Sequence, residues 1–224
     1  FNGVNASTSA NGRVVDGTLN ANGTFFTHAG ATSRVSSTGV VTAISGLQVI
    51  SGGTLNNSGR ISSLVSNAGT LTSNNQLTAG LSNGSSGAAS ISGVLNGSVS
   101  NAGTLTIVGN TTSTGSFASS LSSVTTVNAG ATWSGLTSLT NGSTAATGLQ
   151  INGALSLAAG ATFTGATGST TRVGTTGSLT LSDPAAQRLI TLNGTAQFIN
   201  DALDTGAVIN NGAVTNNGAW TGAY

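Results

Sequence analysis

The chain has 224 residues, of which 4% are charged, with a formal net charge of +1 and neither cysteine nor methionine. Ordinary globular domains carry about 25% charged residues, so this is not the composition of a typical globule. The five arginines are scattered, which disfavours nucleic-acid binding, and the lack of cysteine excludes disulfides and thiolate metal sites. With 37% hydrophobic residues and little net charge, the chain is nevertheless expected to fold.

The apolar residues indicate a narrow core. Most are valine, leucine, isoleucine and alanine, and aromatic residues make up 4% of the chain. A thin core built in layers needs few side chains per layer, so this inventory favours an elongated repeat protein. No stretch approaches the ~20 apolar residues of a membrane-spanning helix, and no direct membrane insertion is expected. The chain opens with FNGVNAST rather than a charged and then hydrophobic leader, so we expect a mature or excised segment.

A repeat runs along the chain. The motif Asn-Ala-Gly-Thr-Leu-Thr occurs at 67–72 and again at 101–106. Turn glycines recur at nearly even intervals, first at positions 53, 69, 87 and 103 and later at 142, 160, 177, 194 and 212. Their spacing gives a repeat unit of about 17 residues, with irregular stretches near 30–53 and 110–142.

Within the repeats, apolar and polar residues alternate as they do in strands. The alternation is clear at 104–107, 154–157, 178–181 and 189–192, and a period of two directs one side of each strand inward. Asn-Gly steps punctuate the chain, and both residue types tolerate the positive φ of sharp turns. Asn-Gly turns can also join antiparallel hairpins. Hairpins, however, do not explain why turn and strand recur at a near-constant spacing.

A parallel β-solenoid does explain the spacing. Each repeat would form one coil, and each strand would pair in parallel with its equivalent in the next coil, so that equivalent Asn, Thr and Ser residues stack as ladders along a rod. We therefore predict an all-β parallel β-helix with about 17 residues per repeat, forming a single domain over residues 1–224. An outward loop is expected near 183–188, where Asp183 and the only proline, Pro184, interrupt the pattern.

Few residues could carry acid–base chemistry. The carboxylates are Asp16, Asp183, Asp201 and Asp204, and the only imidazole is His28. Glycosidases need paired carboxylates at a groove. Asp201 and Asp204 are close enough in sequence to meet on one loop, but a loop-stabilising role is favoured for them. Serine is too abundant for a triad with His28 to be a signal, so no catalytic residue is predicted and the chain is not expected to be an enzyme.

Metal and cofactor sites are not expected either. Calcium-binding β-rolls repeat a Gly-Gly-x-Gly-x-Asp motif, whereas Gly-Gly occurs once here, at 52–53, and aspartate does not recur with the repeat. The glycine-rich turns also lack the Lys-Ser/Thr ending of phosphate-binding loops. The sequence therefore predicts no bound metal and no cofactor.

A family resemblance is visible in several repeated segments: SGGTLNNSGRI at 51–61, SNAGTLT at 66–72 and 100–106, TVNAGATWSG at 126–135 and LAAGATFTG at 157–165. The texture of about 50–220 resembles the passenger domains of bacterial autotransporter adhesins and related repetitive surface proteins. This resemblance implies a right-handed parallel β-helix displayed outside the cell. It also implies self-association, biofilm formation or attachment to host or cell-surface glycans or proteins. No functional residue is carried over by position.

Two functional expectations follow, both extracellular. The first is a secreted or bacterial cell-surface adhesin whose Asn, Thr and Ser ladders and low charge let neighbouring rods stick side by side. The alternative is a self-polymerising fibre subunit that stacks end to end through open solenoid ends, with Phe1 packing against Trp220 or Tyr224 across the joint. A polysaccharide-acting β-helix enzyme is a minor alternative, because it would need a charged groove that four aspartates and five arginines hardly furnish.

Overall fold

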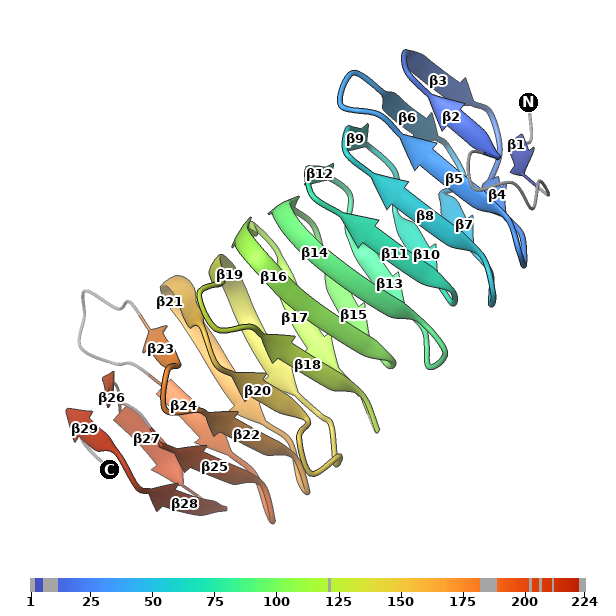
Figure 1. The fold of residues 1–224 in the computed structure, drawn as a ribbon. Helices are drawn as coiled ribbons and strands as arrows, with labels where there is room; N and C mark the ends of the chain where they lie inside the picture. The colour runs from blue at the N-terminus through green and yellow to red at the C-terminus, as the bar shows by residue number, and fades with distance from the viewer. Residues whose placement is uncertain are drawn as a thin grey trace.

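The computed structural model describes residues 3–5, 12–120, 122–181, 189–201, 203–205, 207–210 and 212–221. These residues form 29 strands and no helix, and every strand pairing is parallel. The strands stack as coils of an elongated β-solenoid (Figure 1). The predicted all-β parallel solenoid is confirmed. Residues 183–188, predicted to form an outward loop, lie outside the described residues.

Equivalent strands of successive coils form three faces. The first face consists of β1 (Gly3–Asn5), β4 (Phe25–Thr27), β7 (Leu47–Val49), β10 (Val65–Asn67), β13 (Leu81–Asn83), β15 (Val99–Asn101), β17 (Ser116–Ser119), the C-terminal parts of β19 (Thr132–Asn141) and β21 (Ala154–Gly165), β24 (Leu189–Leu192) and β27 (Ala207–Asn210). The second consists of β2 (Arg13–Val15), β5 (Thr32–Val35), β8 (Thr54–Asn57), β11 (Thr70–Ser73), the N-terminal parts of β14 (Ala88–Leu95) and β16 (Thr104–Thr112), β18 (Val124–Val127), β20 (Leu149–Ile151), β22 (Thr170–Val173), β25 (Gln197–Asn200) and β28 (Ala213–Asn216).

The third face completes each coil. It consists of β3 (Thr18–Ala21), β6 (Val40–Ala43), β9 (Arg60–Ile61), β12 (Gln76–Leu77), the remaining parts of β14, β16, β19 and β21, and then β23 (Ser178–Leu181), β26 (Leu203–Thr205) and β29 (Ala219–Thr221). Strands β14, β16, β19 and β21 are long because each continues around a corner from one face to the next. All lateral backbone pairing is therefore made within the rod, and its sides present side chains.

The coils are longer on average than the predicted repeat. The inward column of the first face runs through positions 25, 47, 65, 81, 99, 117, 139, 163 and 190. Its interval is shortest between Val65 and Leu81 and longest between Phe163 and Ile190. The predicted spacing thus approximates the middle of the rod, while the coils overall lie roughly 20 residues apart. The strands keep their pairing throughout, so the additional residues are accommodated at the corners.

Alternating apolar residues fill the interior as predicted. In β21, Leu155 and Leu157 are buried while Ser156 between them is half-buried. The larger side chains interlock across the core: the rings of Phe117 and Trp133, from the first and third faces of one coil, meet edge to face with centroids 5.2 Å apart. The indole Nε1 of Trp133 also donates a 2.9 Å hydrogen bond to Ser113 Oγ, so its polar group is satisfied inside the core.

Asparagines line the corner between the first and second faces. Asn67, Asn83 and Asn101 stack in consecutive coils and are only 1–2% exposed. Asn67 donates to Asn83 Oδ1 and Asn83 to Asn101 Oδ1, each at 2.8 Å. The asparagines of two Asn-Ala-Gly motifs, with Asn83 between them, thus form an internal ladder. Its asparagines lie inside the rod and not on the surface, where the sequence led us to expect them, because their amides satisfy one another and the turning backbone.

The turn glycines are required mainly for close packing between coils. A Cβ on Gly103 would lie 2.3 Å from the carbonyl oxygens of Gly84 and Gly87 in the preceding coil. Of the predicted Asn-Gly turns, Gly97 and Gly194 do have positive φ, at 83° and 58°. Gly153 does not, yet a Cβ there would lie 2.2 Å from Asn128 O. Close backbone approach therefore explains glycine at these corners more often than left-handed backbone does.

Candidate recognition surfaces

The residues predicted to join subunits end to end are mostly beyond the described part of the chain. Phe1 and Tyr224 lie outside it. Trp220 belongs to β29, where its backbone pairs with that of Asp204 in β26, and its side chain is not described. The end-to-end contact remains a prediction.

Of the four aspartates, Asp201 has the most defined surroundings. Its Oδ2 lies 2.6 Å from Arg172 Nε, and its Oδ1 accepts a 2.8 Å hydrogen bond from Asn217 Nδ2. The hydrogen bond from Asn217, and then that from Arg172, lower the pKa of Asp201. These contacts tie the corners after β25 and β28 to the exposed side of β22. A carboxylate held in its charged form in this way suits a structural role better than proton donation.

The other acid–base candidates are dispersed. Asp16 is exposed beyond the end of β2, Asp183 lies outside the described residues, and the side chain of Asp204 is not described. The predicted proximity of Asp201 and Asp204 therefore stays a prediction. His28 is half-buried, with its ring centroid 6.1 Å from that of Phe26. In the described ranges, no three His or Asp side chains come together to hold a metal ion.

The outer side of the second face carries two columns of small, mostly polar residues. One runs through Thr54, Thr70, Ala88, Thr104 and Val124, and the other through Asn56, Thr72, Ser90, Thr106 and Thr126. None of these hydroxyl groups makes a side-chain hydrogen bond to another described residue, so they are available to solvent or a partner. Unlike the buried asparagines, these columns do not bond to themselves along the rod.

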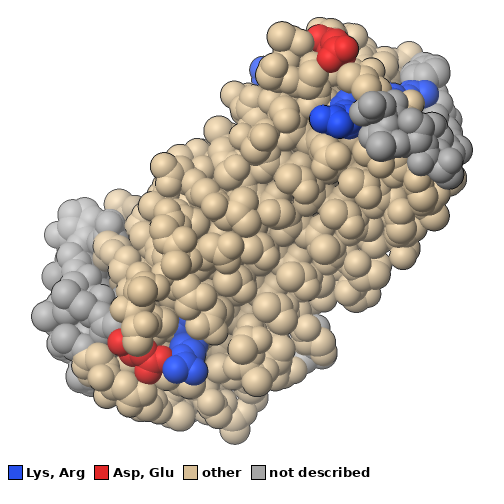
Figure 2. Space-filling view, in the orientation of Figure 1, with Lys and Arg blue, Asp and Glu red and all other residues tan. Residues whose placement is uncertain are grey.

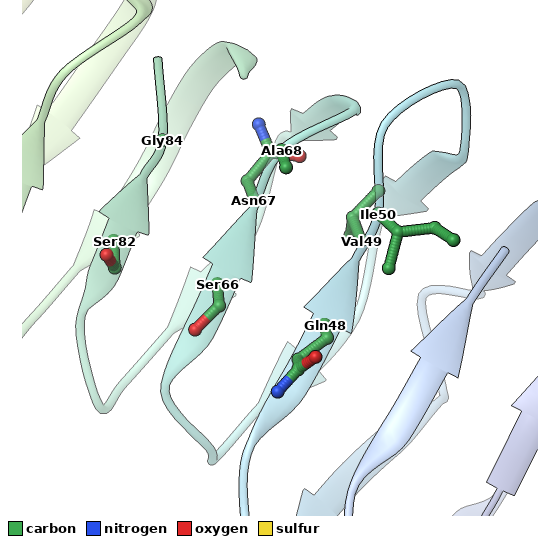
Figure 3. A pocket seen from close by; sticks show the side chains of 8 residues that line it. All are labelled: Gln48, Val49, Ile50, Ser66, Asn67, Ala68, Ser82 and Gly84. Atoms are coloured by element: carbon green, nitrogen blue, oxygen red, sulfur yellow. The ribbon is translucent and has the colours of Figure 1, made fainter. Parts of the chain in front are cut away.

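A shallow groove of about 230 Å³ crosses the first face at β7, β10 and β13 (Figure 3). Gln48, Ser66 and Ser82 project from the middle of these strands, one above the other. Ile50 and Ala68 lie beside them at the corner that follows each strand. Nothing in the sequence pattern indicates this groove, because it arises where a large corner residue, Ile50, is followed in the next coils by Ala68 and Gly84.

Charge is confined to the two ends of the rod. Residues 61–171 contain no Asp, Glu, Lys or Arg. Figure 2 accordingly shows charged side chains near both ends of the visible face and none between them. Arg34 precedes the second outer column, pairing in backbone register with Asn56, and Arg172 follows it, pairing with Gln150. The intervening coils form an uncharged belt, which we define as residues 61–171.

No family model, no curated protein and no solved structure matches the chain. Among the described residues, no helix is long and apolar enough to cross a membrane.

Proposed function

We propose that the chain is an extracellular structural or adhesive rod of a bacterial cell surface, which associates side by side with other copies through the uncharged belt. The observation that carries this proposal is the absence of charge from 61–171. Like-charge repulsion normally keeps neighbouring proteins apart, and a net charge near zero favours association. The proposal assigns the chain no catalytic activity.

The shape of the rod supports the same role. Backbone hydrogen bonds run between coils, so the sides of the belt offer hydroxyl, amide and methyl groups instead of unpaired strand edges. Two rods side by side would bury these groups over many coils. Weak contacts repeated along a rod add up, as they do in any multivalent contact. The resemblance to autotransporter adhesins supports an extracellular location and a role in attachment.

The test introduces charge into the belt. Thr72, Ser100 and Thr112 are exposed and lie on the second, first and third faces, with Thr72 two coils before the coil that contains Ser100 and Thr112. Changing all three to Lys should abolish concentration-dependent association in sedimentation velocity. Changing all three to Asp should do the same, with far-UV circular dichroism confirming the fold of both variants.

Mixing the two variants provides the matched control. Rods with Lys and rods with Asp should associate with each other when combined, and salt should weaken that mixed association. Wild-type rods that stay monomeric, and that fail to clump cells displaying them, would refute the proposal.

A further inference from the structure

The two outer columns of the second face form a regular grid. From β8 to β18 they place ten outward residues, two per strand, on five strands that pair in continuous register. Seven of the ten carry a hydroxyl group: Thr54, Thr70, Thr72, Ser90, Thr104, Thr106 and Thr126. Neighbouring strands lie about 4.8 Å apart, and alternate residues of a strand about 6.6 Å apart. The hydroxyl groups are thus set out in two dimensions at fixed intervals.

The grid has a firm base. Beneath it, Leu55, Leu71, Ala89 and Leu105 are stacked and at most 4% exposed. The register shift within β14 comes after Ile91, past the residues that form the grid. Threonine is also stiff at χ1, because it is β-branched. The positions of the outward groups are therefore set by the fold before any ligand arrives.

The chemistry of the grid selects against most ligands. It contains no charged residue and so offers nothing to attract an ion. None of the ten residues is aromatic, so it lacks the flat rings on which sugars stack. What it does offer is unpaired hydroxyl groups, each threonine also presenting a methyl group. Hydroxyl groups hold water, and methyl groups restrict where that water can sit.

We infer that this face binds ice. Both spacings of the grid are close to repeat distances in the oxygen lattice of ordinary ice, so water held on the face would continue into a crystal surface. A charged side chain would break the pattern, because it orients water around itself. This inference does not rest on the proposed association, since a single rod carries the complete grid.

The experiment measures thermal hysteresis and inhibition of ice recrystallisation by the purified chain. Wild-type protein should show both activities. Changing Thr72 and Thr106 to Lys, in the centre of the grid, should abolish them. The matched control, Ser66→Lys with Ser100→Lys, places the same charges on the first face and should leave both activities unchanged.

A milder variant separates grid chemistry from folding defects. Changing Thr72 and Thr106 to Val keeps the branched shape and removes two hydroxyl groups, so it should lower thermal hysteresis without changing the melting temperature appreciably. A wild-type chain with neither activity would overturn the inference. An equal loss of both activities in the first-face control would also overturn it. So would a wild-type chain that binds insoluble cellulose but has no effect on ice. Side-by-side association of rods that lack ice activity would overturn this inference alone.

Discussion

The side-chain amide of Asn67 donates a 2.8 Å hydrogen bond to Oδ1 of Asn83, which occupies the same position one coil further along the rod. Asn83 repeats the contact with Asn101, and it also donates to Gly87 O at 3.2 Å in its own turn and to Thr104 O at 2.9 Å in the next coil. Each asparagine therefore fixes both the turn of its own coil and the distance to the next one. A buried amide in such a row is costly to lose, since its neighbours would keep polar groups without partners.

Replacing Asn83 with Ala should lower the free energy of unfolding by at least about 2 kcal/mol, because several buried groups lose their partners at about 1–3 kcal/mol each. Urea denaturation followed by circular dichroism measures the change. Ser82→Ala in the same strand is the control: Ser82 faces outward and should change stability by less than about 0.5 kcal/mol. Equal stability of the two variants would argue against a structural role for the ladder.

Gly103→Ala should be strongly destabilising, by about 1–3 kcal/mol or more, because its Cβ would overlap two carbonyl oxygens at 2.3 Å. The comparison is Gly17→Ala, where a Cβ has nothing within 4 Å. That change should be neutral or raise stability by up to about 1 kcal/mol. Thermal unfolding of both variants tests whether close approach of the backbones of neighbouring coils or general flexibility explains the corner glycines. A tolerated Gly103→Ala would rule out close approach as the reason.

Ser113→Ala should cost about 1–3 kcal/mol, because the buried indole N–H of Trp133 would lose its acceptor. Trp133→Phe in the same background removes the unpaired donor, so the double variant should be less destabilised than the sum of the two single changes. A double-mutant cycle measured by urea denaturation gives the coupling between the two residues. Additive effects would mean that the 2.9 Å contact contributes nothing to stability.

The Asp201 contacts predict a pH dependence. Its pKa is lowered in the folded chain, so the stability it contributes is present above its ordinary pKa of 3.8 and is lost as the pH falls through the lower folded value. Wild type should therefore melt at a higher temperature than Asp201→Asn at pH 7, and the difference should vanish in stronger acid. Asn217→Ala should raise the pKa of Asp201, as a carbon-13 titration of the carboxyl would show. An unchanged titration would exclude the hydrogen bond from Asn217 as its cause.

Local periodicity was enough to predict the fold. The alternation at 154–157 places Leu155 and Leu157 inward, and the structure buries both. Coil length was less predictable, because Phe163 pairs directly with Ile190 although far more of the chain separates them than separates the equivalent pair Val65 and Leu81. Turn glycines indicate that a corner is present but not how many residues it contains. Because strand pairing does not depend on that number, the sequence pattern leaves the coil length open.

The candidate surfaces could be predicted only in part. Thr-x-Thr at 70–72 and 104–106 is visible in the sequence, and alternation alone turns these residues outward. Their alignment into columns depends on the strand register. The structure establishes this register by pairing Thr72 with Ser90 and Ser90 with Thr106. The inward position of Asn67 was not predicted, because a polar residue next to a turn is usually solvated.

The unequal coils have a consequence for change over time. Short and long coils coexist with unbroken pairing of the inward column, so segments can be gained or lost at a corner while the neighbouring strands keep their partners. A rod of this kind can acquire new loops one coil at a time, each displayed at a defined height along its axis. Its outline is free to diversify while its interior stays the same.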